Sequence, residues 1–530
     1  MNRFTERLEA AAALGMQGRF EEALALAREL AAANPSHAEG YLLCGNSLRG
    51  LGATLAAEAC YRKALALQPG LAAAGYNLGM LLLEQDRPAE AEPLLADAWS
   101  RGIGFQALVG LAKCRLASGR GEDALRAVRQ QLEAEPDDAQ AHALHGFVLQ
   151  TYRFEPEAAL SAYAAALRLG LDSAELHANI GIAHQDLGAL DEAIRQYDLA
   201  LARDPGYPRA RWQRALARLL QGEFAAAWPD YEVRLEHERR VRSPRFKAWQ
   251  GESLSGRRIV VVAEQGVGDQ IMFASCVPDL VAQGAKVTLE CEPRLAALFR
   301  RSFEDVAVHG VRPGEIAVHA AGDYEIHAGS LPRYLRPDWA SFPRRQAYLR
   351  ADAAAVERWR LRLASAGPGP FIGFTWRGGT LQSRSPLRSL ELVRLEPIFR
   401  ARQATWVSLQ HGVDAEEAPK LGQARGLRLL HFPEAIDELD ELAALITALD
   451  LVVTACNSVV HLAGALGVRA LVMAPFSPEW RYLAKGERLP WYPSVRVVRQ
   501  ARYGDWESVI AQVAQEVAAA PTRTGAPPRG

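Results

Sequence analysis

Polar residues interrupt an apolar stretch at 451–476, LVVTACNSVVHLAGALGVRALVMAPF. The pattern predicts a buried strand at 451–454, a turn at Asn457 and Ser458, and a helix at 459–466. Free backbone N–H groups at the start of such a helix attract an anion. His461 lies one turn into the helix. It either reaches that anion or is a hydrogen-bonded core residue.

A glycine turn, EQGVGDQ at 264–270, offers a second position for chemistry. The flanking residues predict strands at 259–263 and 286–290 and a helix at 269–283. Gly266 and Gly268 let the backbone approach a ligand, and the helix start favours an anion or an oriented acid.

Two alternatives remain open at this turn. As a dinucleotide fingerprint it would use Glu290 to read the ribose, but Ile271 stands where the third glycine is needed. Asp269 is either a functional acid or a simple helix N-cap.

The second half of the chain supplies the elements that position these residues. Short β-branched runs alternate with helical periodicity, which predicts βα units and parallel sheets. The stretch ASAGPGP, ending at Pro370, divides them into two lobes. A cleft between such lobes is the expected ligand site.

The first half is a repeat array. Small alanines recur every 33 to 35 residues, at Ala23, Ala57, Ala91, Ala124, Ala158, Ala193 and Ala227. Glycines and prolines follow the same step. This pattern resembles the tetratricopeptide repeat (TPR), in seven copies from about residue 5 to 239. Some copies depart from it: Ile103 and Gly170 replace the terminal proline, and Arg153 replaces the central glycine.

Stacked TPR units form a superhelix with a concave surface that binds peptides or partner proteins. A spacer or an oligomerisation module is the alternative. Asn77 and Asn179 share one repeat position, but the other copies lack it, which argues against an asparagine ladder for peptide.

Composition narrows the function. The net charge of -1 over 530 residues provides no general field for nucleic acid or anionic lipid. Six cysteines without metal-ligand spacing favour reduced thiols and a cytoplasmic protein. No secretion signal is expected, and Arg469 with His461 argues against a membrane span at 451–476.

Several ordered blocks in residues 245–500 carry a further resemblance: AEQGVGDQIMF, IGFTWRGG, SPLRSL, WVSLQHG, NSVVHLAGALG, PEWRYL and PWYPSVRVVRQ. They resemble the glycosyltransferases fused to TPR arrays in bacteria, which are similar to heptosyltransferases and protein O-GlcNAc transferases. The resemblance implies an α-solenoid followed by a GT-B fold. Its two Rossmann-like lobes would bind the acceptor on the first and a nucleotide sugar on the second.

The resemblance also implies roles for individual residues. Asp269 matches the candidate base for the acceptor hydroxyl. The donor side would comprise Trp376, Arg377, Gly378, Arg388, Gln410, Asn457, Ser458 and His461, and the acceptor side Glu264, Gln265, Gly266 and Gly268. Because the chain has no Asp-x-Asp pair, we expect inverting transfer without a metal and without a cofactor beyond the nucleotide-sugar substrate.

One position departs from the resemblance. Relatives have Asp-Thr-Ser where this chain has Cys456, Asn457 and Ser458, and a thiol does not accept hydrogen bonds as a carboxylate does. Cys456 is expected to be a small buried residue rather than a nucleophile, because no activating base lies nearby in the sequence.

The predicted function is a cytoplasmic protein O-glycosyltransferase acting on Ser or Thr of a protein held by the TPR groove. The resemblance points to flagellin as acceptor and to CMP-pseudaminic acid or another CMP-nonulosonate as donor, with UDP-GlcNAc next. A non-catalytic TPR scaffold with a decayed transferase domain is the alternative, and a sugar-nucleotide epimerase is a third.

The predicted organisation has five parts. A TPR array spans 1–239, the first lobe 240–366 and the second lobe 367–500. A closing helix follows at 501–520, and a disordered tail at 521–530.

Overall fold

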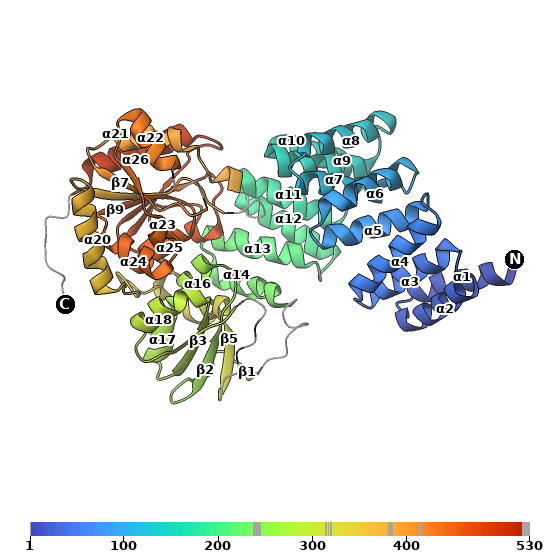
Figure 1. Ribbon diagram of the computed structural model, residues 1–530, viewed down its shortest axis with the longest axis horizontal. Helices are drawn as coiled ribbons and strands as arrows, with labels where there is room; N and C mark the ends of the chain where they lie inside the picture. Colours follow the sequence, from blue (N-terminus) through green and yellow to red (C-terminus); the bar gives the residue numbers. More distant parts are fainter. Residues whose placement is uncertain are drawn as a thin grey trace. The chain divides into compact units, whose positions relative to one another are not determined.

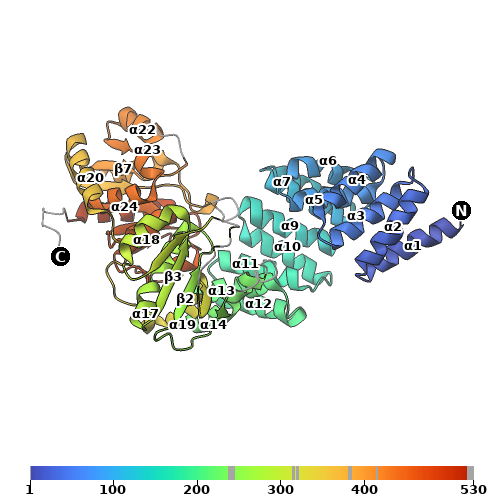
Figure 2. The ribbon, with the colours of Figure 1, turned by 60° about the horizontal axis from the view of Figure 1, so that its bottom comes forward.

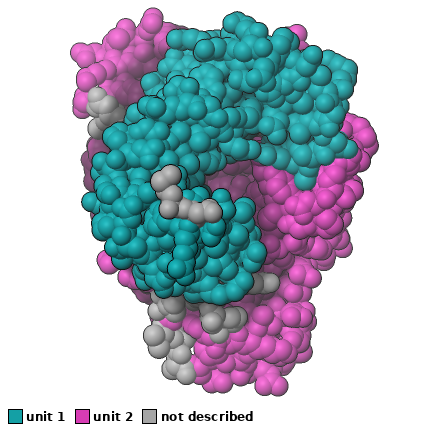
Figure 3. All heavy atoms as spheres, turned by 90° about the vertical axis from the view of Figure 1, so that its right-hand side faces the viewer, with its two compact units in different colours: residues 1–183 teal, residues 184–530 magenta. Residues whose placement is uncertain are grey.

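The computed structural model describes residues 2–236, 245–312, 315, 317, 321–379, 385–412 and 416–521. The chain forms two compact units, residues 1–183 and 184–530, which are coloured separately in Figure 3. The predicted start of the first lobe at 240 and all but the first residue of the predicted tail lie outside the described residues.

The first half of the chain is a series of helical hairpins, which confirms the predicted TPR solenoid (Figures 1 and 2). The hairpins described are α1 (Asn2–Met16) with α2 (Phe20–Ala33), α3 (Ala38–Gly50) with α4 (Thr54–Leu67), α5 (Ala72–Glu84) with α6 (Pro88–Ser100), α7 (Phe105–Ala117) with α8 (Gly121–Ala134), α9 (Ala139–Val148) with α10 (Pro156–Arg168), α11 (Ala174–Asp186) with α12 (Leu190–Arg203), and α13 (Pro208–Gln221) with α14 (Phe224–Tyr231).

Each hairpin turn needs one residue in the left-handed backbone region, and this explains the recurrent glycine. Gly18, Gly52, Gly119, Gly188 and Gly222 all take φ between 72° and 83°. Asp86 (φ 59°) and Phe154 (φ 55°) take this conformation in the two remaining hairpins. Phe154 follows a π-helical turn, Leu149–Arg153.

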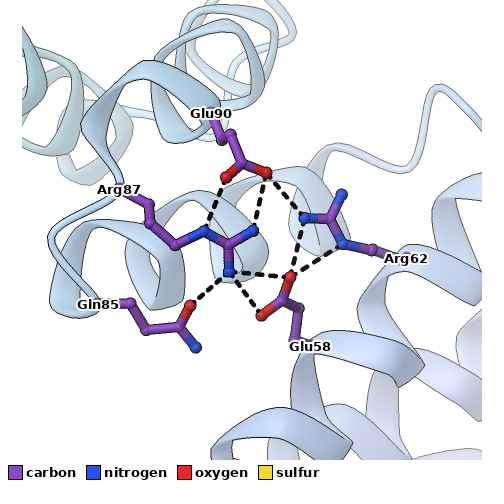
Figure 4. Close-up of polar contacts among 5 residues, drawn as sticks. All are labelled: Glu58, Arg62, Gln85, Arg87 and Glu90. Carbon is purple, nitrogen blue, oxygen red and sulfur yellow. Dashed lines mark hydrogen bonds and ion pairs between the residues drawn. The ribbon is translucent and has the colours of Figure 1, made fainter.

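A ladder of ion pairs joins the second helices of successive repeats (Figure 4). Arg87, just before α6, bonds Glu58 of α4 at 2.9 Å and Glu90 of its own helix at 2.7 Å. Arg62 also reaches both carboxylates, at 2.8 and 3.1 Å. Two repeats later, Arg153 pairs with Glu122 in the second helix of the preceding repeat.

The first α/β lobe has a parallel sheet in the order β1-β5-β2-β3-β4. Its strands are β1 (Lys247–Ala248), β2 (Arg258–Val262), β3 (Lys286–Cys291), β4 (Ala307–Gly310) and β5 (Tyr324–His327). Its helices are α16 (Val267–Ala274), α17 (Val277–Ala282), α18 (Ala296–Ser302) and α19 (Leu331–Leu335). The helix predicted at 269–283 is therefore wrong: it is interrupted before Pro278, which lies in the first turn of α17.

The second lobe has a parallel sheet in the order β11-β10-β9-β6-β7-β8. Its strands are β6 (Phe371–Phe374), β7 (Thr405–Ser408), β8 (Leu429–His431), β9 (Leu451–Ala455), β10 (Ala470–Ala474) and β11 (Val495–Arg499). Its helices are α20 (Ala353–Ala366), α21 (Glu396–Arg400), α22 (Glu417–Arg425), α23 (Pro433–Ile436), α24 (Leu439–Ala448), α25 (Ser458–Ala465) and α26 (Trp506–Ala519). Numbered from β6, this is the doubly wound order 3-2-1-4-5-6.

The last repeat helices pack against the α/β lobes inside the second unit. Trp228 of α14 donates its indole N–H to the carbonyl of Arg336 at 2.9 Å. The amide of Ala484 donates to the carbonyl of Leu220 in α13 at 2.7 Å. The repeat pattern thus runs to α14, whereas the division into compact units falls inside α11.

Buried apolar side chains on one face of each sheet continue into α14 as one core. The strands are buried on both faces, which explains their near-continuous apolar runs. The opposite face of the second sheet packs on α21 and α26, which lie side by side (Figure 1). Among the helices of the described residues, none combines the length and apolar character that crossing a membrane requires.

Candidate functional site

The predicted site residues follow strands at the two topological switch points. In the first sheet, residues 264–269 follow β2, which lies between β3 and β5. In the second sheet, residues 376–378 follow β6 and Asn457 follows β9, and these strands are neighbours. Ligands of open parallel sheets bind outside the carboxyl ends of the strands at such points.

The starts of helices α16 and α25 lie against each other. A Cβ placed on Gly268 would lie 2.9 Å from Cδ2 of His461 and 3.6 Å from Cα of Ser458. The structure therefore brings the glycine turn of the first lobe and the polar turn of the second lobe together. The first backbone N–H groups of each helix have no partner within the helix, and the helix dipole is positive at this end. The junction therefore favours an anion.

Asn457 caps α25. Its Oδ1 accepts from the amide of Val459 at 3.0 Å, and its Nδ2 donates to Oγ1 of Thr375 at 2.8 Å and to the carbonyl of Arg377 at 3.0 Å. One of the N–H groups expected to meet a ligand is therefore already bonded by Asn457. The same side chain holds the loop after β6 against the start of α25.

Asp269 is bound by an arginine from the other lobe. Nε of Arg481 donates to Oδ1 of Asp269 at 2.7 Å, and Nη2 of Arg481 donates to the same oxygen. No donor to Oδ2 is found among the described residues. The N-cap of α16 is Gly266, without a side-chain bond, so the simple N-cap interpretation of Asp269 is wrong.

Arg481 belongs to a chain of alternating charges. Burial alone would lower its pKa, but the carboxylates of Asp269 and Glu479 raise it. Glu479 also pairs with Nη1 of Arg388 at 2.5 Å. The side chain of Arg388 is buried, and its Nε has no hydrogen-bond partner in the described part of the chain.

Arg377 differs from Arg388. Its guanidinium is half exposed and pairs with Glu417 at 3.1 Å. The structure leaves no room for a side chain at Gly378 or Gly379. A Cβ at Gly378 would lie 2.3 Å from the carbonyl oxygen of Cys456, and the guanidinium of Arg388 covers Gly379. The loop after β6 is therefore packed tightly between β9 and Arg388.

His461 is a buried, neutral histidine. Its Nδ1 hydrogen-bonds with the hydroxyl of Tyr492 at 3.0 Å. Burial, and then the charge of Arg481, lower the pKa of His461 to about 3. The hydrogen-bonded core interpretation therefore describes this residue, although it also forms the wall against Gly268.

Gln410, which follows β7, holds the loop after β6. Its Oε1 accepts from the amides of Trp376 and Arg377 at 3.0 and 2.9 Å. The indole of Trp376 is fully buried and stacks on Phe374, with ring centroids 5.7 Å apart. Trp376, predicted as a donor contact, is thus a core side chain, and only its backbone bonds Gln410.

Cys456 is also buried. Burial raises the pKa of its thiol to about 12, and its Sγ contacts the carbonyl of Met473 at 3.7 Å. A thiol of this kind is inert at neutral pH. All six cysteines are free.

The acceptor-side residues Glu264 and Gln265 contact α14 and the turn that follows it. Glu264 is buried, pairs with Arg234 at 2.8 Å and accepts from the amide of Gly329 at 2.6 Å. Burial would raise the pKa of Glu264, but Arg234 lowers it. Gln265 has φ of 61°, an unusual conformation that is enriched at functional sites, and its Nε2 donates to the hydroxyl of Tyr231 at 3.0 Å.

Arg481, Glu479, Arg234 and Tyr231 were not singled out from the sequence. Arg481 and Glu479 lie within the block PEWRYL, so the resemblance included this segment. It did not indicate which residues the segment contacts. Asp269 is 212 residues away from Arg481, a separation that no local pattern reveals.

The TPR array has a groove of its own. A cavity of about 360 Å³ lies among α7, α9 and the start of α11. Phe105, Val109, Phe147 and Leu176 contribute apolar side chains, and Lys113 and Glu175 contribute charges of opposite sign. Asn179 also lines it, and its buried Oδ1 accepts no hydrogen bond from the described residues. The groove therefore suits an apolar side chain next to a hydrogen-bond donor.

Comparisons with known proteins agree on the repeats. Residues 8–72, 42–107, 105–146, 155–208 and 179–235 match tetratricopeptide repeat families. Protein FlbA of Caulobacter vibrioides is 32% identical over 480 residues, covering 86% of this chain and 80% of that protein.

Solved TPR structures match parts of the chain. YrrB, described as a TPR protein with an unusual peptide-binding site, is 22% identical with a TM-score of 0.27, covering 35% of this chain and 95% of YrrB. PilW, described as a type IV pilus biogenesis factor, is 18% identical with a TM-score of 0.35, covering 40% of this chain and 98% of PilW.

Proposed function

The chain belongs to the family of Protein FlbA of Caulobacter vibrioides, and within that family we propose that it is a protein O-glycosyltransferase. Its two parallel lobes are interpreted as a GT-B fold that binds a nucleotide sugar. Its TPR groove is proposed to hold the protein acceptor. The free thiols are compatible with the cytoplasm as its location.

One observation carries this proposal. Asp269 comes from the first lobe, lies at the carboxyl edge of its sheet and contacts Arg481 from the same edge of the second lobe. A carboxylate and a set of anion-attracting groups thus meet where two doubly wound sheets place ligands. Glycosyl transfer needs this combination of a base and a site for a leaving phosphate.

In the proposed reaction, Oδ2 of Asp269 takes the proton of an acceptor Ser or Thr hydroxyl. The hydroxyl oxygen forms a bond to the anomeric carbon, and the bond from that carbon to the donor phosphate breaks with inversion. The nucleotide leaves with the electron pair. Arg388 and the N–H groups at the start of α25 would stabilise its charge, because oriented donors in a water-poor site act most strongly on developing anions.

The donor is proposed to be a CMP-nonulosonate such as CMP-pseudaminic acid, or UDP-GlcNAc, and the acceptor is proposed to be flagellin. Intact-mass spectrometry of flagellin from the source organism tests this. We expect the sugar mass to be lost when the gene is deleted and restored by the wild-type gene but not by Asp269→Asn. An unchanged flagellin mass after deletion would refute flagellin as acceptor.

A non-catalytic scaffold is the second candidate function. It is favoured by Cys456, which stands where the resemblance to glycosyltransferases implies a carboxylate, and whose buried thiol has a pKa raised to about 12. A scaffold would still use the TPR groove. It predicts that Asp269→Asn has the same cellular effect as the wild-type gene.

A further inference from the structure

The last repeat hairpin reaches the candidate site through Trp480. This side chain is 5% exposed and packs edge-on against Trp228 and Tyr231 of α14, with ring centroids 5.9 Å apart in both pairs. Edge-to-face aromatic pairs stabilise one particular arrangement of rings. Trp491 contacts the same ring, with centroids 6.2 Å apart, so α14 sets the position of Trp480 together with Trp491.

Arg481 is the next residue, and it holds Asp269. Its guanidinium lies over the ring of Trp480, 5.1 Å from the centroid. From there Nε and Nη2 both bond Oδ1 of Asp269. This leaves Oδ2 as the oxygen that can meet a substrate, since no described residue donates to it.

The backbone around Arg481 is held from both sides. The carbonyls of Tyr482 and Leu483 both accept from Nη2 of Arg499 at 2.8 Å. Leu483 adopts φ 58° and ψ 163°, a region that a leucine occupies only when its surroundings impose it. The amide of Ala484 donates to the carbonyl of Leu220 in α13. The segment 480–484 is thus held in one conformation between the last hairpin and the site.

We propose that Arg481 is a positioning residue for Asp269, and that α14 sets the place of Arg481 through Trp480. The role of Asp269 as the catalytic base rests on the proposed function. The hairpin α13–α14 then serves the site directly, in addition to ending the TPR array. Because two N–H groups fix one carboxylate oxygen, the other is presented in a constant direction.

Hydrogen exchange of the full chain tests this without a substrate. The readout is the exchange rate of the α16 amides, residues 267–274. We compare the wild type with Arg481→Gln, Arg481→Lys, Trp480→Ala, Trp480→Phe and the double variant Asp269→Asn/Arg481→Gln. Arg496→Gln is the matched control, because Arg496 also pairs with carboxylates, at 2.6 and 3.0 Å, but away from α16. Thermal unfolding confirms that each variant is folded.

Arg481→Gln is expected to speed α16 exchange by about tenfold or more, because it leaves the partly buried carboxylate of Asp269 unpaired. Trp480→Ala is expected to act in the same direction, because it removes the ring under the Arg481 guanidinium. Arg481→Lys and Trp480→Phe are expected to have smaller effects. The double variant is expected to exchange more slowly than Arg481→Gln, because it removes the unpaired charge. Unchanged α16 exchange in Arg481→Gln, or a double variant that exchanges faster than Arg481→Gln, would overturn the proposal.

Transfer kinetics separate this inference from the proposed function. Arg481→Gln is expected to lower kcat and kcat/KM equally, since positioning of a base acts in the transition state. A wild-type chain without transfer activity whose α16 exchange responds to Arg481→Gln would refute the transferase and support the positioning contact. Unaltered kcat in Arg481→Gln would overturn the positioning of Asp269.

Discussion

Gly268 of α16 lies directly against His461 of α25, so closely that the Cβ of an alanine at position 268 would be 2.9 Å from Cδ2 of the imidazole. This approach joins the two lobes at the carboxyl edges of their sheets. The packing between the two helices therefore requires a residue without a Cβ at position 268. The two predicted motifs meet at this contact.

The first prediction concerns that contact. Gly268→Ala is expected to destabilise the protein by about 1–3 kcal/mol, the usual cost of overpacking. Urea unfolding measures it. Gly266→Ala is the matched control, because the nearest atom to a Cβ there is Oδ2 of Asp269, at 3.7 Å. Equal unfolding midpoints for the two variants would contradict the close approach of α16 to α25.

The second prediction concerns the pH dependence caused by His461. Its folded pKa is about 3, while an unfolded histidine titrates near about 6.5. Between these values the unfolded state binds the proton and the folded state does not, so stability falls as the pH falls through this window. The slope from one such group is at most about 1.4 kcal/mol per pH unit.

Unfolding measured from about pH 4 to about pH 7 checks this. His461→Gln is expected to reduce the loss of stability at acid pH, because glutamine does not titrate. His411→Gln is the control, because His411 is exposed. A His461→Gln variant with the full wild-type acid slope would show that His461 is charged in the folded protein.

The third prediction concerns the TPR groove. Phe147 is half-buried in the cavity wall, so Phe147→Ala is expected to weaken acceptor binding by about tenfold or more, as loss of an aromatic anchor does. Asn179→Ala is expected to weaken it as well, because an N–H group of the proposed acceptor would lose Oδ1 as its hydrogen-bond partner. Calorimetric titration with flagellin measures both. Leu55→Ala, at an 81% exposed position of α4, is the control and is expected to bind as the wild type does.

The fourth prediction concerns the ion-pair ladder in Figure 4. Arg87→Ala removes the contacts to both Glu58 and Glu90. It is expected to lower the urea midpoint of the array at low salt and to have less effect at high salt. The reason is that the screening length falls from about 10 Å at 0.1 M to about 3 Å at 1 M. A loss of stability independent of salt would show that Arg87 acts by packing instead.

Local patterns predicted the elements well where one residue type recurs for a physical reason. The left-handed turn of each TPR hairpin explains the glycine period, and β-branched runs explain the strands. Apolar periodicity predicts one helix at 269–283, but it does not show the break before Pro278, which lies in the first turn of α17. A proline in a first turn is also the ordinary start of a new helix.

The site was harder to predict, because its contacts are long-range. The turn at Asn457 and the glycine turn were both recognised, and sheet topology then explains why they meet. The orientation of the Trp376 indole into the core and the hold of Arg481 on Asp269 depend on packing between elements far apart in the chain. Periodicity along the sequence contains no information about either.

The central claim is that a nucleotide sugar binds where the starts of α16 and α25 meet. Hydrogen exchange of the full chain, with and without saturating CMP- or UDP-linked sugar, tests it most directly. We predict slower exchange in both 267–274 and 458–465. Binding detected by calorimetry that leaves both segments unprotected would contradict the claim.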